Sequence, residues 1–540
     1  MESYDYIVVG AGTSGCVVAG RLSESGRHRV LVLEAGGSDN TFWIRVPIGY
    51  GRTFVDPRVN WMYETEPDPA TLNRKAYWPR GKVLGGSGSI NALVYMRGLA
   101  QDYDDWARAG NPGWGWEDVL PYFKKLEDHC GGASAVHGAG GPIRITDVSR
   151  SCHPLVQRYL DAAKALGIRE TADFNGEQQE GVGIYQILTR NGFRESTSFA
   201  YLHPARKRPN VTLRTNCHVL RLTFEGTRAT GVVYRDAAGR EVTATAARSV
   251  VLSGGAINSP QLLQLSGVGP RALLGKHGIP LVKDAPAVGQ NLQDHLNISY
   301  FYRSKVRTLN NELYPWYGKL WAGIRYVLTR SGPLSMSVNQ GGGFVRSDLN
   351  QTVPNLQLYF NPASYTTSPG DTRKLMNPDP FAAFLLSFNS CRPTSRGHLE
   401  IRSRDPLVHP AIHPNYLSTD KDIEEAMGGM RLLRKLAATR PLADVIEEEM
   451  IPGPSKQSDD ELLADFRQRA GTVYHPTCTC RMGPDPKESV VDARLRVHGL
   501  DGLRVIDASV FPYVTSGNTN APSIMVGEKG AAMLQEDTGA

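Results

Sequence analysis

Four separated segments of the chain are mainly apolar. Residues 4–9 and 30–33 lie near the N-terminus, residues 248–252 lie mid-chain, and residues 503–506 lie close to the C-terminus. Short runs of this kind are typical of strands in a parallel sheet that is covered on both faces. A single sheet built from segments so far apart requires that other material is inserted between them.

The intervening segments have a different pattern. Apolar and polar residues alternate in parts of 150–200 and 296–470, for example at 355–360 and 398–403. A period of two predicts an antiparallel sheet with one face turned to solvent or to a ligand. We therefore expect a second domain that binds a substrate.

One stretch, residues 314–330, has helical periodicity. Lys319 and Arg325 lie off an apolar stripe that is formed by Tyr317, Leu320, Trp321, Ile324, Val327 and Leu328. Most stripes of this kind pack on their own protein, and this is the prediction here. A lid or a helix on a membrane surface is the alternative.

A glycine motif follows the first apolar segment directly, with the sequence Gly10-Ala11-Gly12-Thr13-Ser14-Gly15. Gly10 permits a tight turn, Gly12 lets a pyrophosphate approach the backbone, and Gly15 lets the next helix, residues 16–22, pack on the strand. Glu34 ends the second apolar segment, where an acid can accept a hydrogen bond from a ribose 2′-OH. The motif predicts an adenine dinucleotide and leaves open whether it is NAD or FAD.

This placement predicts an α/β fold (α+β overall), with a Rossmann-like nucleotide-binding domain and an inserted substrate-binding domain of antiparallel sheet plus helices. The nucleotide-binding domain is expected to be discontinuous and to comprise residues 1–150, 201–295 and 471–540. The substrate-binding domain is expected to comprise residues 151–200 and 296–470.

Composition narrows the class of protein. The chain has 540 residues, of which 41% are hydrophobic, and its formal charge is only +6, which does not suggest a nucleic-acid binder. The seven cysteines are dispersed along the chain, which argues against a disulfide framework and fits a reducing cytoplasm. Cys478 and Cys480 are too close together for the usual spacing of zinc ligands, so no metal site is expected. Because the glycine motif begins at residue 10, we expect no signal peptide, and no apolar run is long enough to span a membrane. A cytoplasmic protein is predicted, with peripheral contact to the cytoplasmic side of a membrane as an option.

Further glycine-rich or polar stretches suit a flat ligand and acid–base chemistry. Residues 80–92 and 254–263 are rich in small residues, whose backbone N–H groups can meet a ring edge or a pyrophosphate. His475 can take a proton near neutral pH, and Asn518 can hydrogen-bond an alcohol oxygen without adding charge. The helix after Asn518 begins near Ala521 and Pro522, and its N-terminus favours nearby negative charge.

Taken together, these motifs resemble the glucose–methanol–choline (GMC) oxidoreductases, which are FAD-dependent enzymes that oxidise alcohols. The resemblance covers essentially the whole chain and rests on the glycine motif, residues 80–91, 254–265 and 392–397, and the segment from His475 to Asn520. Residues 495–500 and 516–522 look most like the branch of choline dehydrogenase and alcohol dehydrogenase (acceptor).

The resemblance implies FAD, with Glu34 on the adenosine ribose, Asn91 beside the isoalloxazine and Val219 near the adenine. The cofactor-binding residues that it implies are Gly10, Gly12, Thr13, Ser14, Gly15, Glu34, Ala35, Arg80, Val83, Gly86, Ser87, Asn91, Ala92, Leu93, Val94, Val219, Ser253, Asp507, Ala508, Asn518 and Thr519.

The resemblance also implies a reaction. His475 would take the hydroxyl proton of a primary aliphatic or aromatic alcohol, Asn518 would hold the oxygen, and hydride would pass to flavin N5 to give the aldehyde. Electrons would then go to a quinone, an electron-transfer protein or another acceptor. The alternatives are an alcohol oxidase that uses O₂, an FAD-dependent lyase or photodecarboxylase on the same fold, and an NAD enzyme or flavin-binding module without this chemistry.

Two departures from the family pattern refine these expectations. Some members attach FAD through a histidine just before the signature asparagine, and Ile90 stands there, so FAD should be non-covalent. The choline branch has an acid where this chain has Gln340, so an uncharged alcohol is preferred over choline. Tyr474, Gln340, Phe360, Tyr365 and Phe388 are candidates for the substrate pocket, although the aromatic residues among them equally suit a sheet core. The oligomeric state is left open.

Overall fold

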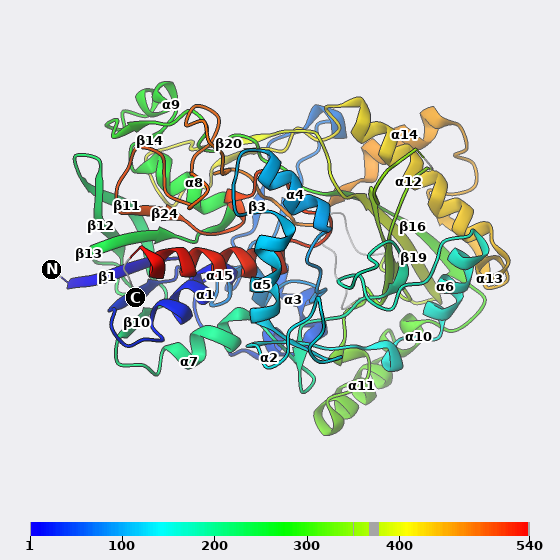
Figure 1. The fold of residues 1–540 in the computed structure, drawn as a ribbon. Coiled ribbons are helices and arrows are strands. Elements are labelled where there is room, and N and C mark those ends of the chain that lie inside the picture. Colours follow the sequence, from blue (N-terminus) through cyan, green and yellow to red (C-terminus); the bar gives the residue numbers. More distant parts are fainter. Residues whose placement is uncertain (1, 349, 367–376, 538–540) are drawn as a thin grey trace.

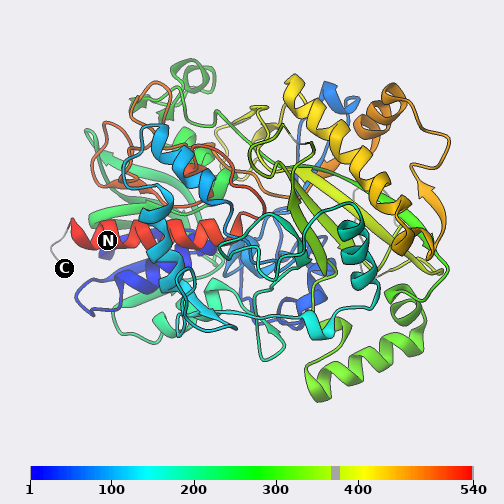
Figure 2. The same ribbon diagram turned by 45° about the vertical axis from the view of Figure 1, so that its right-hand side comes forward.

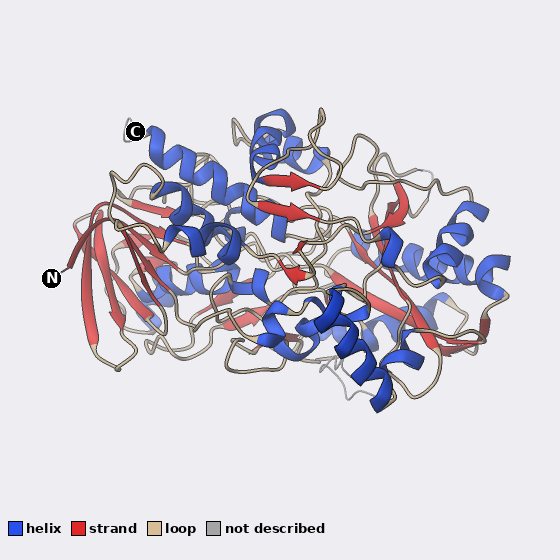
Figure 3. Cartoon of the chain, turned by 90° about the horizontal axis from the view of Figure 1, so that it is seen from below, coloured by secondary structure: helices blue, strands red, loops and turns tan. Residues whose placement is uncertain are grey.

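The computed structural model describes residues 2–348, 350–366 and 377–537. Two seven-stranded sheets lie at opposite ends of this described part, and helices and loops fill the region between them (Figures 1 and 3). The mixed α/β class predicted from the sequence is confirmed. The domain boundaries stay a prediction, although each sheet draws its strands from the expected segments, apart from one short strand at Gly471 and Thr472.

The first sheet brings the separated apolar segments together. Its strands run in the order β10-β2-β1-β13-β12-β11, and β24 pairs with β13 on the other side. Val8 lies opposite both Val32 and Val251, and all three side chains are fully buried. The strands are β1 (Glu2–Val9), β2 (Val30–Leu33), β10 (Val211–Arg214), β11 (His218–Glu225), β12 (Arg228–Arg235), β13 (Glu241–Leu252) and β24 (Leu503–Val505). The five strands around β1 pair in parallel, and β11 and β12 extend them as an antiparallel hairpin.

Helices α1 (Thr13–Leu22) and α15 (Asn520–Glu536) pack side by side against this sheet (Figure 1). The hydroxyl of Ser14 donates to the carbonyl of Ser523 at 2.7 Å, so the two ends of the chain are joined beside the glycine motif. Helix α8 (Gly255–Leu265) follows β13 and contacts β11.

The second sheet is antiparallel throughout and has the order β22-β16-β19-β18-β17-β7, with β23 paired to β16. Helices α12 (Asp420–Ala438) and α6 (Leu155–Ala165) cover it. The predicted alternation is present in β18, where Leu356 and Leu358 face the apolar core and Tyr359 faces a cavity. The strands are β7 (Gly181–Ile184), β16 (Leu296–Ser304), β17 (Gly341–Val345), β18 (Leu356–Asn361), β19 (Ala383–Ser390), β22 (Ile446–Ile451) and β23 (Gly471–Thr472).

The other alternating segment is placed differently from its prediction. Residues 398–400 form β20 (His398–Glu400), which pairs only with β21 (Ala411–His413) in a separate ribbon. This ribbon packs on α8, where the Gln264 side chain accepts a hydrogen bond from the backbone N–H of Ile401 at 2.9 Å. Alternation therefore identified a strand correctly but not the sheet to which it belongs.

The expectation that the apolar stripe at 317–328 packs on its own protein is wrong. Helix α11 (Trp316–Thr329) projects from the body of the molecule, and its stripe residues are exposed (Figure 2). Ala322 and Tyr326, on the opposite side of the helix, are buried and attach it to the protein. The small Ala322 and the hydroxyl-bearing Tyr326 gave no strong apolar signal, so periodicity alone assigned the buried face to the wrong side.

Shorter elements complete the described part of the chain. The remaining helices are α2 (Phe42–Arg45), α3 (Tyr50–Thr53), α4 (Ala100–Arg108), α5 (Trp116–Leu126), α7 (His203–Ala205), α9 (Arg271–Lys276), α10 (Leu309–Leu313), α13 (Arg440–Ala443) and α14 (Asp459–Arg469). The remaining strands are β3 (Tyr63–Glu64), β4 (Tyr77–Trp78), β5 (Glu127–His129), β6 (Ile143–Ile145), β8 (Thr189–Arg190), β9 (Phe193–Arg194), β14 (Val268–Gly269) and β15 (Lys283–Asp284). All seven cysteines are free thiols. Among the described helices, none combines the length and the apolar character that a membrane span requires.

Candidate active site

One continuous cavity connects the glycine motif of the first sheet with the polar face of the second sheet. Nineteen of the twenty-one predicted cofactor residues line this cavity, as do His475 and Tyr474. Gly15 and Val83 are the two exceptions. A Cβ on Gly15 would lie 2.0 Å from the carbonyl oxygen of Gly10, so this glycine serves helix packing, and Val83 is fully buried in a small apolar cluster.

The glycine motif presents backbone to the cavity. Gly10 has φ +94°, and a Cβ there would lie 2.6 Å from the carbonyl oxygen of Ser253. Gly12 precedes α1, and a Cβ there would find no atom nearer than 3.7 Å, because Gly12 faces the cavity. The backbone N–H groups at the start of α1 therefore open on the cavity, as an anion site requires.

A second glycine-rich loop lies against the first. The N–H of Gly85 donates to the carbonyl of Ala11 at 2.7 Å, and a Cβ on Gly86 would lie 2.7 Å from the Cα of Gly12. Both loops line the cavity, so glycine is needed here for the close approach of two backbones. The resulting narrow space suits a dinucleotide pyrophosphate.

Glu34 is buried at the far end of the cavity. Its two carboxylate oxygens accept hydrogen bonds from the backbone N–H groups of Gly36 (2.8 Å) and Ala11 (2.9 Å). Burial raises the pKa of Glu34 to about 7, although these two hydrogen bonds oppose the shift. Each oxygen retains a lone pair that can accept from a ribose hydroxyl.

Asp507 holds the end of β24 to the start of α8. Its carboxylate accepts from the N–H of Gly255 (2.9 Å), the hydroxyl of Ser259 (2.6 Å) and the N–H of Ser509 (2.8 Å). Burial raises the pKa of Asp507. Asp507 and Ser253 both line the cavity, so this junction forms a third side of the predicted nucleotide site.

His475 and Asn518 meet at the other end of the cavity, 3.2 Å apart between His475 Nε2 and Asn518 Nδ2. The Oδ1 of Asn518 accepts a hydrogen bond from Gln357 Nε2 at 3.1 Å, and this contact fixes the orientation of the amide. Because the Asn518 nitrogen is a donor, the Nε2 of His475 must be the acceptor. The lone pair of His475 Nε2 therefore faces the cavity.

His295 fixes the tautomer of His475. Its Nε2 lies 2.9 Å from the carbonyl oxygen of Cys391, so this nitrogen carries a hydrogen. Its Nδ1 is then an acceptor and lies 2.9 Å from the Nδ1 of His475. The single proton between the two rings therefore belongs to His475 Nδ1, which leaves His475 Nε2 unprotonated. Burial lowers the pKa of His295 to about 4, so the acceptor persists at neutral pH.

The surroundings of His475 also disfavour its charged form. Its pKa is well below the ordinary value because the ring is buried and lies near His295 and Arg80. Its backbone N–H donates to Asp294 at 2.7 Å, and Arg80 donates to the carbonyl of Tyr474 at 2.5 Å. These contacts hold the residue in place and leave the ring as a neutral acceptor.

Aromatic and amide side chains line the space around His475 and Asn518. The lining includes Tyr50, Phe54, Asn297, Tyr359, Asn361, Tyr365 and Tyr474. Among the described residues, the acids that line the cavity are Glu34 and Asp507, both at its nucleotide end. Within the described part of the chain, the reactive end of the cavity therefore offers no carboxylate to a cationic substrate.

Three predicted pocket residues do not reach this space. Phe360 and Phe388 are buried in the core of the second sheet, and their neighbours Tyr359 and Ser387 line the cavity instead. Side chains alternate between the faces of a strand, so the prediction was one residue out of register in both strands. Gln340 is buried away from the cavity, and its side-chain oxygen accepts from the N–H of His153 at 2.7 Å.

Several residues at the site carried no recognisable motif. Arg194 is buried and donates to the Oδ1 of Asn91 at 2.8 Å, which fixes the asparagine of the second glycine-rich loop. Asp294, His295 and Gln357 likewise act only through contacts made in the folded chain. The single hint in the sequence is that Asp294 and His295 are adjacent polar residues directly before a strand.

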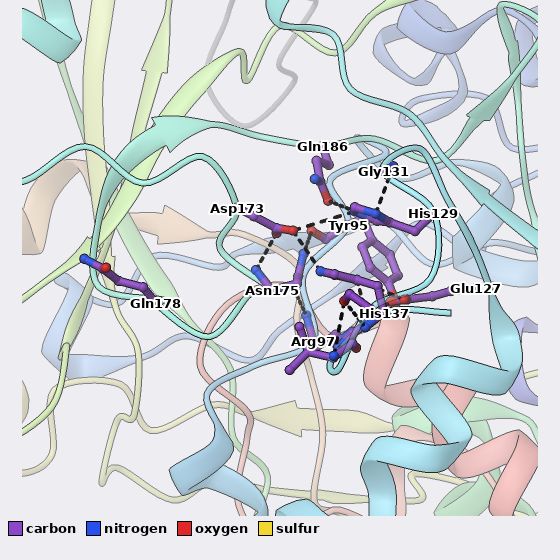
Figure 4. Close-up of polar contacts among 12 residues, drawn as sticks. Tyr95, Arg97, Glu127, His129, Gly131, His137, Asp173, Asn175, Gln178 and Gln186 are labelled. Atoms are coloured by element: carbon purple, nitrogen blue, oxygen red, sulfur yellow. Dashed lines mark hydrogen bonds and ion pairs between the residues drawn. The ribbon is translucent and has the colours of Figure 1, made fainter. Parts of the chain in front are cut away.

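A polar cluster around His137 lies outside the cavity, and Figure 4 shows its side chains. Arg97 pairs with Glu127, which also accepts from His137 at 3.1 Å, and His137 Nε2 lies 2.8 Å from Asp173. Ligand atoms of His129, His137 and Asp173 lie within 4.8 Å of one another, the spacing of a metal site. However, the two imidazole rings stack at 3.8 Å with an angle of 12°, and one ion cannot lie in both ring planes. The arrangement favours an ion-pair network over a metal centre.

Comparison with known proteins gives the same family as the motifs in the sequence. The GMC oxidoreductase family matches residues 4–297 and 393–527. The mitochondrial choline dehydrogenase of Mus musculus is 44% identical, over 99% of this chain and 90% of its own. The alcohol dehydrogenase (acceptor) of Pseudomonas putida is 42% identical, over 98% of this chain and 95% of its own. The crystal structure of pyridoxine 4-oxidase from Mesorbium loti is 31% identical, covers 98% of both chains and has a TM-score of 0.87.

Proposed function

The chain belongs to the GMC oxidoreductases, FAD-dependent enzymes that act on alcohols, and on that premise we propose that it oxidises an uncharged primary alcohol to the aldehyde. The observation that carries the proposal is the pair His475 and Asn518, with the unprotonated Nε2 of His475 facing the cavity. Electrons would pass on to a quinone or another acceptor.

The cofactor would lie along the whole cavity, with its adenosine near Glu34 and Val219 and its isoalloxazine near Asn91 and His475. When bound, FAD supplies the acceptor for the hydride that leaves the carbinol carbon. The position before Asn91 is occupied by Ile90, which lines the cavity and has no nucleophilic atom. We therefore propose non-covalent FAD. Acid precipitation should leave the yellow colour in the supernatant, and a yellow pellet would contradict this.

The proton chemistry would fall to His475 and Asn518. An alcohol placed between them can donate its hydroxyl hydrogen to His475 Nε2 and accept a hydrogen bond from Asn518 Nδ2. Gln357 keeps the amide in this orientation, and His295 keeps the lone pair of His475 on the cavity side. Positioning of this kind, rather than a charged side chain, would lower the barrier to proton removal.

The distribution of charge along the cavity supports an uncharged substrate. The acids among the described lining residues lie at the nucleotide end, so a quaternary ammonium would meet aromatic side chains but no counter-carboxylate at the reactive end. The aromatic lining at the reactive end suits an aliphatic or benzylic alcohol. Gln340 would have no direct contact with the substrate, since its side chain does not reach the cavity.

The test is anaerobic bleaching of the flavin absorbance by a panel of alcohols. We expect butanol and benzyl alcohol to reduce the flavin with a kcat/KM well above that for choline. A clear preference for choline would contradict the substrate proposal. Reoxidation of the reduced protein by a quinone analogue, compared with O₂ and read by hydrogen peroxide yield, tests the acceptor. Stoichiometric peroxide would identify an oxidase.

A further inference from the structure

Helix α11 carries an unusual amount of exposed apolar surface. Seven large side chains of this single helix are exposed, with Leu328 at 76%, Trp316 at 75% and Trp321 at 68%. The others are Tyr317, Leu320, Ile324 and Val327. Contiguous exposed apolar surface on a soluble protein is a mark of an interaction site.

These seven residues form one face of the helix. With about 100° of rotation per residue, they occupy a continuous arc of about 140° that begins at Trp316 and ends at Trp321. The buried residues Ala322 and Tyr326 lie on the opposite side. The helix is therefore amphipathic with its apolar face turned outwards, the reverse of a helix that covers a protein core.

Cationic side chains border both edges of this face. Arg325 lies next to Trp321 around the helix, and Lys319 lies nearest to Trp316 on the other edge. Lys319 and Arg325 are exposed, and α11 contains no acid. Glu312, at the end of α10, is the nearest acid before it in the sequence.

We propose that this face of α11, defined by the seven exposed apolar residues, docks in the interface of a lipid bilayer whose headgroups are anionic. Tryptophan and tyrosine favour the boundary between headgroups and acyl chains, aliphatic side chains reach below it, and the flanking cations meet lipid phosphates. The two-sided cationic border supports an anionic lipid surface rather than a second copy of this chain, whose corresponding face would carry the same positive charges.

The docked face would lie next to the cavity. Ala322 and Tyr326 pack in one apolar cluster with Tyr50 and Val338, and both of those residues line the cavity. Tyr326 also donates to the carbonyl of Gly192 at 2.9 Å, which fixes the base of the helix. An apolar molecule dissolved in the bilayer would thus meet the protein close to its cavity. The docking itself does not depend on the proposed reaction.

The test is co-sedimentation of the FAD-loaded protein with vesicles. Vesicles of phosphatidylcholine with about 30% phosphatidylglycerol should bind the protein more strongly than phosphatidylcholine alone, and salt should weaken the difference. Trp321→Glu combined with Leu328→Glu should lower binding to the anionic vesicles by about tenfold or more, because two large apolar side chains no longer enter the bilayer. Lys319→Gln combined with Arg325→Gln should abolish the preference for anionic vesicles.

Leu407→Glu is the matched control, since Leu407 is also exposed but lies outside α11, and its vesicle binding should equal the wild type. Flavin absorbance and its bleaching by alcohol in solution should be unchanged in all variants, which separates docking from folding and from catalysis. Absence of vesicle binding, or binding that the α11 double variant does not reduce, would overturn the proposal. A wild-type dimer that becomes a monomer in the double variant, with no vesicle binding, would assign the face to a second copy instead.

Discussion

The two ends of the cavity present different chemical groups to a ligand. At the nucleotide end, the contacts are backbone N–H groups presented by glycine loops, and the carboxylates of Glu34 and Asp507 are held by further backbone N–H groups. At the reactive end, the contacts are side chains, and His475, His295 and Asn518 form a chain of neutral hydrogen bonds. Backbone N–H groups can bind a polar ligand in many conformations. A proton acceptor, in contrast, works only when its side chain is held in one tautomer and one orientation.

The electrostatic settings differ in the same way. The carboxylates of the nucleotide end are buried, and hydrogen bonds to backbone N–H groups offset part of the rise that burial causes in their pKa values. No carboxylate contacts the ring of His475 in the described part of the chain, and the nearby Arg80 disfavours a second positive charge. The nucleotide end is therefore organised to bind a polar ligand. The reactive end is organised to stay neutral until a substrate supplies a proton.

Apart from the replacement of His475 itself, the largest expected effect is at the nucleotide end of the cavity. Gly12→Val should leave the fold intact but fill the space in front of α1, and a steric conflict of about 1–3 kcal/mol would weaken FAD binding by about 10- to 100-fold. The measurement is the flavin-to-protein absorbance ratio after gel filtration, followed by titration with FAD. Gly275→Val is the control, because Gly275 in α9 has open space around its Cβ. Normal flavin content in Gly12→Val would show that the loop does not face the cofactor.

The next prediction distinguishes the role of His295, which fixes the tautomer of His475, from the role of His475 as the base. His295→Leu removes the acceptor for His475 Nδ1–H and should slow alcohol-driven flavin reduction by up to about 10²-fold, because the ring is no longer held in one tautomer and position. His295→Gln keeps a side-chain oxygen acceptor and should recover part of the rate. The rate constant of anaerobic flavin reduction is the readout, with FAD content as control. Equal rates in both variants and the wild type would remove His295 from this role.

The pH dependence is a smaller effect. Burial, His295 and Arg80 all lower the pKa of His475, so its ring stays neutral and able to accept a proton as the pH falls through the ordinary histidine value of about 6.5. The kcat/KM for an uncharged alcohol should therefore stay level from about pH 8 to about pH 6. A steep fall centred near pH 6.5 would show that His475 titrates normally. In His295→Leu the pKa of His475 should move upwards, since one of the neighbours that lower it is gone.

The smallest effect concerns the polar cluster outside the cavity. Burial lowers the pKa of His137, but its hydrogen bonds to Asp173 and Glu127 outweigh this, and the net pKa is raised. Its contribution to stability is therefore complete below about pH 6.5 and is lost as the pH rises through the raised pKa. His137→Gln should lower Tm at about pH 6 by more than at about pH 8.5. An equal Tm difference at both pH values would show that His137 is not charged in the folded protein. Addition of EDTA should leave the Tm of the wild type unchanged, and a large drop would indicate a bound metal instead.

The same contrast between the two ends of the cavity explains which parts of the site could be predicted from the sequence. The nucleotide end was predictable because its sequence signal is local. Gly10, Gly12 and Glu34 mark a strand, a turn and a second strand within about thirty residues. His475 and Asn518 were singled out by their side-chain chemistry and the residues around them, and the resemblance to a family supplied their roles in the reaction. His295, Gln357 and Arg194 were missed because their roles exist only as contacts between distant segments.

The errors in the substrate half have one physical origin. Alternation gives the strand but not which face meets the cavity, so Phe360 and Phe388 were assigned one residue away from Tyr359 and Ser387. Helical periodicity likewise gives the stripe on α11 but not whether it faces inward. In each case the missing information is the tertiary partner of the face.

The most direct test of the account is the rate at which alcohol reduces the flavin of His475→Ala under anaerobic stopped flow. Since Nε2 of His475 is the acceptor at the reactive end, the rate constant should fall by about 10²- to 10⁴-fold, while the flavin content stays that of the wild type because the glycine loops are intact. Reduction at a near-normal rate would contradict the account, since the proton would then leave by another route.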